Sequence, residues 1–186
     1  MSHSESIPGT LFLIVGPSGS GKDSLLNGAR VALADKSDVI FVRRVITRPA
    51  SAGGENHRAV DEATFEKMRS DKAFALHWDA HDLRYGVPAE VRGDLAQGRK
   101  VVVNASRGIL DTARASFPKV QVISVTVPQG ILAQRLRARG RENEQQIQRR
   151  LERAQAFDLK GNDVVALDNG GSLDEAVARF VVLLGQ

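Results

Sequence analysis

The chain has 186 residues, of which 42% are hydrophobic and 26% charged, and it contains no cysteine. This composition is typical of one globular domain and excludes disulfides and thiolate metal sites. The net charge of +4 points to nucleic acid or an anionic small molecule as ligand. No apolar run approaches the roughly 20 residues that span a bilayer, and the N-terminus does not resemble a signal peptide, so we expect a cytoplasmic protein.

The first predicted element is a buried strand at 11–15, which ends at a glycine-rich loop with the sequence GPSGSGKDS. An amphipathic helix follows at 24–34. Glycines at a strand–helix turn let backbone N–H groups converge, and the helix N-terminus adds positive charge, so this loop predicts a nucleotide-phosphate site. Lys22 is expected to reach the β- and γ-phosphates. The loop comprises Gly16, Pro17, Ser18, Gly19, Ser20, Gly21, Lys22, Asp23 and Ser24.

Asp23 departs from the usual form of such a loop, which has a hydroxyl residue after the lysine. A carboxylate beside phosphates is repelled unless a cation lies between them, and Mg²⁺ prefers oxygen ligands. One hypothesis is therefore that Asp23 binds Mg²⁺, directly or through a water molecule. The alternative is that Asp23 only complements the positive helix end, and that Ser24 supplies the hydroxyl.

The remaining apolar segments alternate with amphipathic ones, which favours a doubly wound α/β fold with a parallel sheet. The stretch 47–88 breaks this alternation and holds the single Trp and the single Tyr, so it is interpreted as an inserted substrate-binding subdomain. Two basic helical segments flank a glycine in 135–150, which predicts a mobile lid. Further strands are predicted at 39–42, 101–103 and 120–127, and further helices at about 107–116, 129–138, 145–158 and 173–184.

Several motifs together resemble the guanylate kinases. They are GPSGSGK in the loop, VITRP at 45–49, GENH at 54–57, RYGVP at 84–88 and the basic run at 135–151. The resemblance implies a P-loop kinase with a parallel five-stranded sheet flanked by helices, an inserted substrate-binding subdomain and a helical lid. It implies one domain over 1–186, with its core at 7–46 and 89–186, the insertion at about 47–88 and the lid at about 137–148.

The departures from that family lie at its guanine site. His77 stands where the family has a glutamate, Val87 replaces a hydroxyl residue, and VNASRG at 103–108 lacks the family's carboxylates. A neutral imidazole offers a single acceptor and cannot replace a carboxylate that accepts two hydrogen bonds from guanine. The blocks GKDS, ITRP with GGENH, LHW with RYGVP, and VVVNASR resemble the ribose 1,5-bisphosphate phosphokinases of bacterial phosphonate degradation. That resemblance implies ATP and Mg²⁺ as cofactors and 5-phosphoribosyl 1-diphosphate as the product.

Such an acceptor has a phosphate oxygen that is already ionised at neutral pH, so the reaction calls for arginines and not for a base. By resemblance, the substrate-binding residues are Arg48, His57, Arg84, Tyr85 and Arg107. The lid residues Arg139, Arg141 and Arg150 are expected at the transferring phosphoryl group, and the catalytic set is Lys22, Asp23, Arg139 and Arg150. We interpret Arg43, Arg44 and Arg58 as solvated surface charges, Arg135 and Arg137 as structural or solvent-facing, and Trp78 as core packing.

Other functions stay open from the sequence. The chain could be a guanylate kinase or a kinase of a sugar hydroxyl, for which Asp79 or Asp82 would be the base. His77, Asp79, His81 and Asp82 could also suggest a metal site, but we favour hydrogen bonds to ribose hydroxyls for one or two of them and surface exposure for the rest. It could also be a non-catalytic guanylate-kinase-like module, although such modules generally lose the phosphate loop. We expect a small-molecule substrate, neither nucleic acid nor membrane as partner, and a monomer or homodimer.

Overall fold

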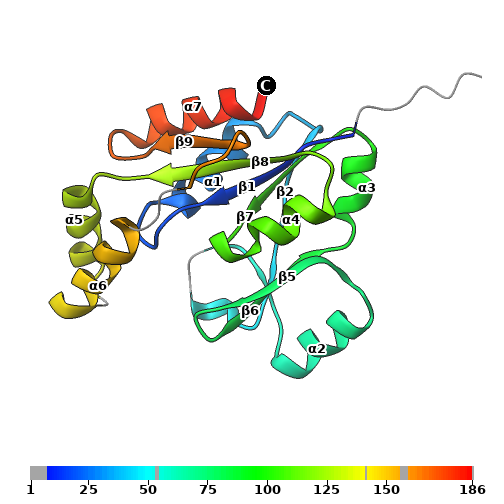
Figure 1. Cartoon of the computed structure of the whole chain (residues 1–186), viewed down its shortest axis with the longest axis horizontal. Coiled ribbons are helices and arrows are strands. Elements are labelled where there is room, and N and C mark those ends of the chain that lie inside the picture. The colour runs from blue at the N-terminus through cyan, green and yellow to red at the C-terminus, as the bar shows by residue number, and fades with distance from the viewer. Residues whose placement is uncertain (1–7, 53–54, 141, 156–158, 186) are drawn as a thin grey trace, which may run out of the picture. The chain divides into compact units, whose positions relative to one another are not determined.

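The computed structural model describes residues 8–52, 55–140, 142–155 and 159–185 (Figure 1). Five strands form one sheet in the order β2-β7-β1-β8-β9, and the pairs β2–β7 and β8–β9 are parallel. All five residues of β1 are buried, as the apolar run at its position predicts. The strand β9 was not predicted. The bounds are β1 Leu11–Val15, β2 Val39–Phe41, β7 Lys100–Asn104, β8 Val120–Thr126 and β9 Val164–Asp168.

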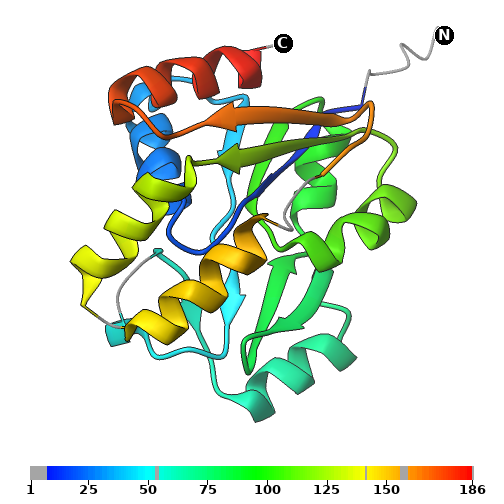
Figure 2. The same ribbon diagram turned by 60° about the vertical axis from the view of Figure 1, so that its left-hand side comes forward.

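The chain divides into two compact units, one within Met1–Leu13 and Asp35–Gln121 and the other within Ile14–Ala34 and Val122–Gln186. The second unit contains the glycine-rich loop and four helices whose positions confirm the sequence prediction to within a few residues. Figures 1 and 2 show α5 and α6 side by side, packed through the apolar residues Leu132, Ala133, Leu136, Ile147 and Leu151. The helices are α1 Lys22–Ala32, α5 Gln129–Arg139, α6 Glu144–Gln155 and α7 Leu173–Gly185.

The first unit contains a second sheet, in the order β4-β3-β6-β5. Its hairpin β5–β6 turns at His81 and Asp82, which have positive φ angles of 53° and 59°, as a tight hairpin turn requires. The predicted helix at 107–116 begins as a 3₁₀ turn, η2, before α4. The strands are β3 Val45–Ile46, β4 Arg58–Ala59, β5 Phe74–Ala80 and β6 Leu83–Pro88; the helices are η1 Ala50–Ala52, α2 Glu62–Ser70, α3 Val91–Ala96, η2 Arg107–Ile109 and α4 Leu110–Ser116.

Strand register sorts the side chains of this second sheet onto two faces. Ile46 is opposite Tyr85, and Tyr85 is opposite Trp78, so these three residues share one face. Arg44 precedes β3, and its guanidinium lies 4.9 Å from the centroid of the Tyr85 ring, so it belongs to this face. Arg48 lies in the bend after β3, close enough to Tyr85 for its charge to act on that residue. We call the face of Trp78 and Tyr85 the aromatic face.

Candidate active site

The glycine-rich loop follows β1 directly and ends where α1 begins. Gly19 and Gly21 have φ angles of 92° and 82°, in the left-handed region that glycine tolerates and other residues avoid. Gly21 is the N-cap of α1, and Lys22 is its first residue. The Lys22 ammonium donates hydrogen bonds to the carbonyl oxygens of Gly16 at 2.6 Å and Pro17 at 3.1 Å, so it lies back along the loop. The loop therefore has the conformation of an anion nest with a cation beside it.

Asn169, the residue after β9, supports this loop through a hydrogen bond to its backbone. Its side chain is only 2% exposed, and its Nδ2 donates a hydrogen bond of 2.7 Å to the carbonyl oxygen of Ser20. A Cβ added to Gly21 would lie 2.6 Å from that Nδ2 and 3.7 Å from Nη1 of Arg135. Asn169 was not predicted from the sequence, in which its one signal is that it follows the short apolar run 164–167 after a single aspartate.

The arginines that the sequence assigns to a lid differ in their contacts. Arg150 donates a 2.6 Å hydrogen bond to the hydroxyl of Ser18 and forms a 2.9 Å ion pair with Glu142, so one predicted lid residue lies at the phosphate loop. Arg139 is exposed at the end of α5, and Arg141 lies outside the described residues. Arg135 is half-buried, and its Nη1 is buried and has no hydrogen-bond partner among the described residues, so its interpretation as a structural or solvent-facing residue stays a prediction.

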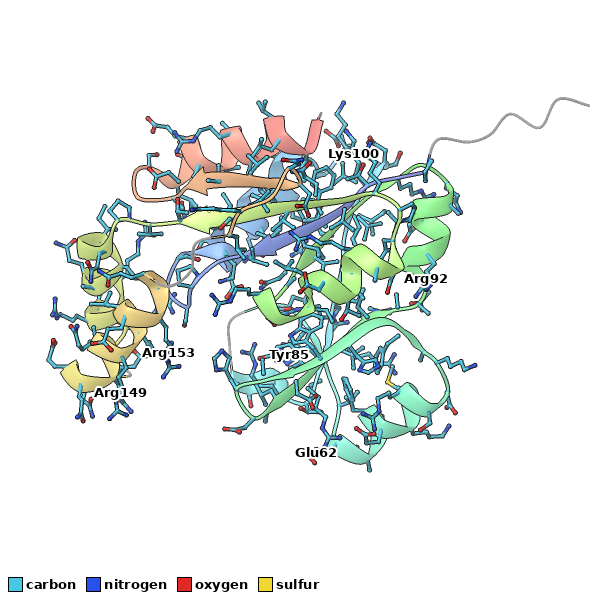
Figure 3. The ribbon with its side chains drawn as sticks, in the orientation of Figure 1. Glu62, Tyr85, Arg92, Lys100, Arg149 and Arg153 are labelled. Atoms are coloured by element: carbon cyan, nitrogen blue, oxygen red, sulfur yellow. The ribbon has the colours of Figure 1, made fainter. Side chains whose placement is uncertain are left out.

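Arg137 forms an exposed ion pair between α5 and the start of α6, so it is both paired and solvent-facing, the two roles that the sequence left open. Its guanidinium donates to both carboxylate oxygens of Glu144, at 2.8 and 2.9 Å, across the α5–α6 turn. These hydrogen bonds raise the pKa of Arg137 and lower the pKa of Glu144 from their ordinary values. Arg149 and Arg153, which Figure 3 labels on α6, are exposed.

Asp23 and Ser24, the two residues after Lys22, are the candidate ligands of Mg²⁺. Asp23 and Ser24 are both exposed in the first turn of α1. Mg²⁺ in kinases is held by one or two protein oxygens and by substrate phosphates, so a single carboxylate at this position is a chemically suitable donor. Within the described ranges, no group of three or more His, Asp or Glu residues is arranged to hold a metal ion. Asp23 therefore fits a magnesium ion chemically, as one oxygen donor beside substrate phosphates.

The aromatic face brings together two of the predicted acceptor residues. The Tyr85 ring stacks on the Trp78 ring, with centroids 5.4 Å apart and planes 7° apart. Burial raises the pKa of Tyr85, while the nearby charges of Arg44 and Arg48 lower it. Arg48 and Tyr85 are therefore close enough to interact electrostatically. Trp78 is 9% exposed, which agrees with its interpretation as a packing residue.

His57 is buried beneath this region, and both of its ring nitrogens contact the main chain. Nδ1 lies 3.0 Å from the carbonyl oxygen of Glu55, and Nε2 lies 2.9 Å from that of Arg48. Arg43, which is exposed as predicted, donates a 3.1 Å hydrogen bond to the carbonyl oxygen of His57. In this conformation His57 supports the backbone of Arg48, and its ring nitrogens are not open to an acceptor.

The structure does not bring Arg84 together with Tyr85. The two residues are consecutive in β6, so their side chains lie on opposite faces of the sheet. The Arg84 guanidinium forms an ion pair with Glu66 and lies 3.7 Å from Glu62, both on α2; Figure 3 labels Glu62 there. Arg107 is exposed at the start of η2, beyond the end of β7.

Arg44 is the clearest correction to the sequence analysis. We interpreted it as a solvated charge, but it is only 6% exposed and forms an ion pair with Glu55 through both Nε and Nη2. The Nε bond to Oε1 measures 2.9 Å. Asn104 at the end of β7 donates a further hydrogen bond of 2.8 Å to Oε2 of Glu55. Arg58, in contrast, is exposed as predicted.

Comparison with known proteins shows the family of this chain. The family model described as guanylate kinase matches residues 9–184. The ribose 1,5-bisphosphate phosphokinase PhnN of Thiobacillus denitrificans is 47% identical over 176 residues, which cover 95% of this chain and 93% of that protein. The bifunctional ribose 1,5-bisphosphokinase-thymidine phosphorylase of Cupriavidus necator is 46% identical over 95% of this chain, which spans 29% of that longer protein.

Among solved structures, guanylate kinase from Anaplasma phagocytophilum has a TM-score of 0.67 at 19% identity, covering 97% of this chain and 86% of that one. This likeness confirms the predicted fold class. None of the helices in the described ranges is both long and apolar enough to cross a bilayer. From the family model and the full-length relative together, the chain belongs to the guanylate kinase family and, within it, to the ribose 1,5-bisphosphate phosphokinases.

Proposed function

We propose that the chain transfers the γ-phosphoryl group of ATP to ribose 1,5-bisphosphate, giving ADP and 5-phospho-α-D-ribose 1-diphosphate. The observation that carries this proposal is the 47% identity to a ribose 1,5-bisphosphate phosphokinase over 95% of the chain. An oxygen of the acceptor's 1-phosphate attacks the γ-phosphorus, and the bond from that phosphorus to the β-phosphate oxygen breaks. ADP leaves with the electron pair of that bond.

The proposed reaction does not require a general base. A phosphate monoester has its second pKa near 6, so the attacking oxygen is already mostly ionised at neutral pH. The main obstacle is repulsion between two polyanions, which positive groups relieve, together with in-line alignment. The described acceptor region fits this demand, because Arg48 lies near Tyr85 and the neighbouring carboxylate, Glu55, is neutralised by its ion pair with Arg44.

The donor is held, in this proposal, by residues 16–24. Lys22 turns from its loop carbonyls to the β- and γ-phosphates, and Arg150 moves from the Ser18 hydroxyl to the transferring phosphoryl group. Arg139 and Arg141 are the other proposed lid ligands. Asp23 is the proposed protein ligand of Mg²⁺, which neutralises phosphate charge when it is bound.

The acceptor is held, in this proposal, chiefly by Arg48 and Tyr85, which are close enough for the arginine charge to act on the tyrosine. Arg107 is a further candidate, and His57 contributes by fixing the backbone of Arg48. Arg84 has less support, because its guanidinium is directed to α2. The expectations of a cytoplasmic protein, a monomer or homodimer that binds neither nucleic acid nor membrane, stay predictions.

The test is a coupled assay for 5-phosphoribosyl 1-diphosphate formed from ATP and ribose 1,5-bisphosphate. GMP and ribose 5-phosphate are assayed in parallel, and the Lys22→Ala variant measures the background. We expect turnover only with the bisphosphate and its loss in Lys22→Ala. Brisk phosphorylation of GMP with no use of the bisphosphate would overturn the proposal in favour of a guanylate kinase.

A further inference from the structure

The ion pair of Arg44 with Glu55 is unusual in being almost buried. The side chains of Arg44 and Glu55 are 8% and 16% exposed, and both nitrogens of the guanidinium fork that face Glu55 are engaged. Removing two charges from water is costly, and apolar residues of similar size often stabilise a fold as well or better. Stability alone therefore does not explain this buried ion pair, and the contacts of Arg44 with its neighbours indicate a second role.

The guanidinium of Arg44 lies against both aromatic rings of the second sheet. Its Cζ is 4.9 Å from the centroid of the Tyr85 ring and 5.7 Å from that of the Trp78 ring. Both distances fall within the range of attractive cation–π contact. Glu55 fixes the guanidinium in place, and Asn104 in turn fixes Glu55 through Oε2. A chain of polar contacts thus runs from the end of β7 to the stacked rings.

The stacked pair also carries an unused donor. The indole Nε1 of Trp78 is buried and has no hydrogen-bond partner among the residues that the structure describes. A buried N–H group without an acceptor is unfavourable, and such groups are rare in native structures. The indole stacks on Tyr85, on which the charge of Arg48 acts, so an oxygen-rich ligand at this face would supply the missing acceptor.

We propose that Arg44 is a positioning residue of the acceptor site, which together with Glu55 and Asn104 holds the Trp78–Tyr85 pair so that the tyrosine hydroxyl and the indole N–H bind oxygens of the sugar bisphosphate. The identity of that ligand rests on the proposed function. The positioning of the two rings does not, because it concerns contacts within the chain. Arg44 neutralises Glu55 and aligns the rings, and Arg48 remains the arginine that contacts phosphate.

The chain offers unusually direct probes of this arrangement, because Trp78 and Tyr85 are its single tryptophan and its single tyrosine. Alkaline titration of the tyrosine absorbance therefore reports Tyr85 alone, and intrinsic fluorescence excited in the indole band reports Trp78 alone. The charges that face Tyr85 are Arg44, Arg48 and Glu55. Arg44→Met removes a positive charge and Glu55→Gln removes a negative one.

The experiment compares wild type, Arg44→Met, Glu55→Gln and the double variant. For Arg44→Met we expect the KM for ribose 1,5-bisphosphate to rise about tenfold or more while the KM for ATP changes less than about twofold, the size expected for one lost charge-assisted alignment. The pKa of Tyr85 should rise in Arg44→Met and fall in Glu55→Gln. Wild-type Trp78 fluorescence should change when ribose 1,5-bisphosphate is added without ATP, and this change should weaken in Arg44→Met.

Two controls separate misfolding from loss of positioning. The double variant removes both buried charges, so it should regain thermal stability relative to Arg44→Met but not the KM for the bisphosphate. Arg58→Met removes an exposed arginine from the neighbouring strand and should leave every readout unchanged.

The two proposals fail in different ways. If wild type does not use the bisphosphate, the proposed function is wrong, while the opposite shifts of the Tyr85 pKa still test the positioning. If wild type is active but Arg44→Met keeps its KM for the bisphosphate, or if both single variants shift the Tyr85 pKa in the same direction, the positioning role is refuted. Recovery of the KM in the double variant would also refute it, since stability alone would then explain the loss.

Discussion

Replacing Gly21 by alanine tests how the phosphate loop is supported. Gly21 has φ 82° and ψ 19°, a left-handed conformation that places its missing Cβ only 2.6 Å from Nδ2 of Asn169. That nitrogen belongs to a side chain that is 2% exposed and is bound to the carbonyl oxygen of Ser20. An alanine must therefore accept a strained backbone and also displace Asn169 from its hydrogen bond.

The expected loss of stability follows from these two effects. The left-handed conformation costs an alanine about 1–2 kcal/mol. Loss of one hydrogen bond adds about 0.5–1.5 kcal/mol, so the free energy of unfolding should fall by about 1.5–3.5 kcal/mol in total. Gly140 provides a matched control, because its φ is also positive, at 60°, but nothing lies within 4 Å of its Cβ position. Gly140→Ala should lose only the conformational part, about 1–2 kcal/mol.

Urea unfolding of both variants measures the difference, which we expect to be about 1 kcal/mol. The double variant Gly21→Ala/Asn169→Ala should be less destabilised than the sum of its single variants, because both lose the same hydrogen bond to Ser20. Equal destabilisation in Gly21→Ala and Gly140→Ala, with additive effects in the double variant, would refute the bracing role of Asn169. ATP binding should weaken in Gly21→Ala, since the loop loses its fixed conformation.

Further predictions concern the metal and the lid. Asp23→Ala should raise the Mg²⁺ concentration needed for half-maximal rate, whereas Ser24→Ala should not; an unchanged Mg²⁺ dependence in Asp23→Ala rejects the metal role. Arg150→Met should lower kcat by about a thousandfold or more with little change in ATP binding, as for other arginines that contact a transferring phosphoryl group. The Arg137 hydrogen bonds lower the pKa of Glu144, so their contribution to stability is present above the ordinary carboxyl pKa and fades as the pH falls through the lowered value. The Tm difference between wild type and Arg137→Met should therefore shrink in acid, and a constant difference would contradict this.

Local sequence predicted those parts of the molecule whose signal lies in neighbouring residues. The loop at 16–24 combines its glycines, its lysine and a flanking apolar strand in one segment, and the structure has that strand–loop–helix order. Asn169 could not be predicted in the same way, because its partner Ser20 is 149 residues away. β9, which positions Asn169, follows no such local motif and was missed.

The second sheet shows a different limit of sequence reasoning. β3 has two residues, too few for an alternating pattern to be recognised, and β6 was not assigned. The faces of Arg44 and Arg84 were therefore unknown, and a buried charge was taken for a solvated one. Spacing within the RYGVP motif gave no warning that Arg84 and Tyr85 would separate. The pairing of β3 with β6 is needed to assign Arg44 to the face of Tyr85 and Arg84 to the opposite face.

The two-residue period of that sheet constrains how this enzyme can vary in length. Arg84 and Tyr85 are consecutive in β6, so one side chain is directed to α2 and the other stacks on Trp78. An insertion or deletion that shifted the register of this strand by one residue would exchange the two faces and break both contacts. Length changes within the hairpin are therefore compatible with both contacts only when they preserve that register.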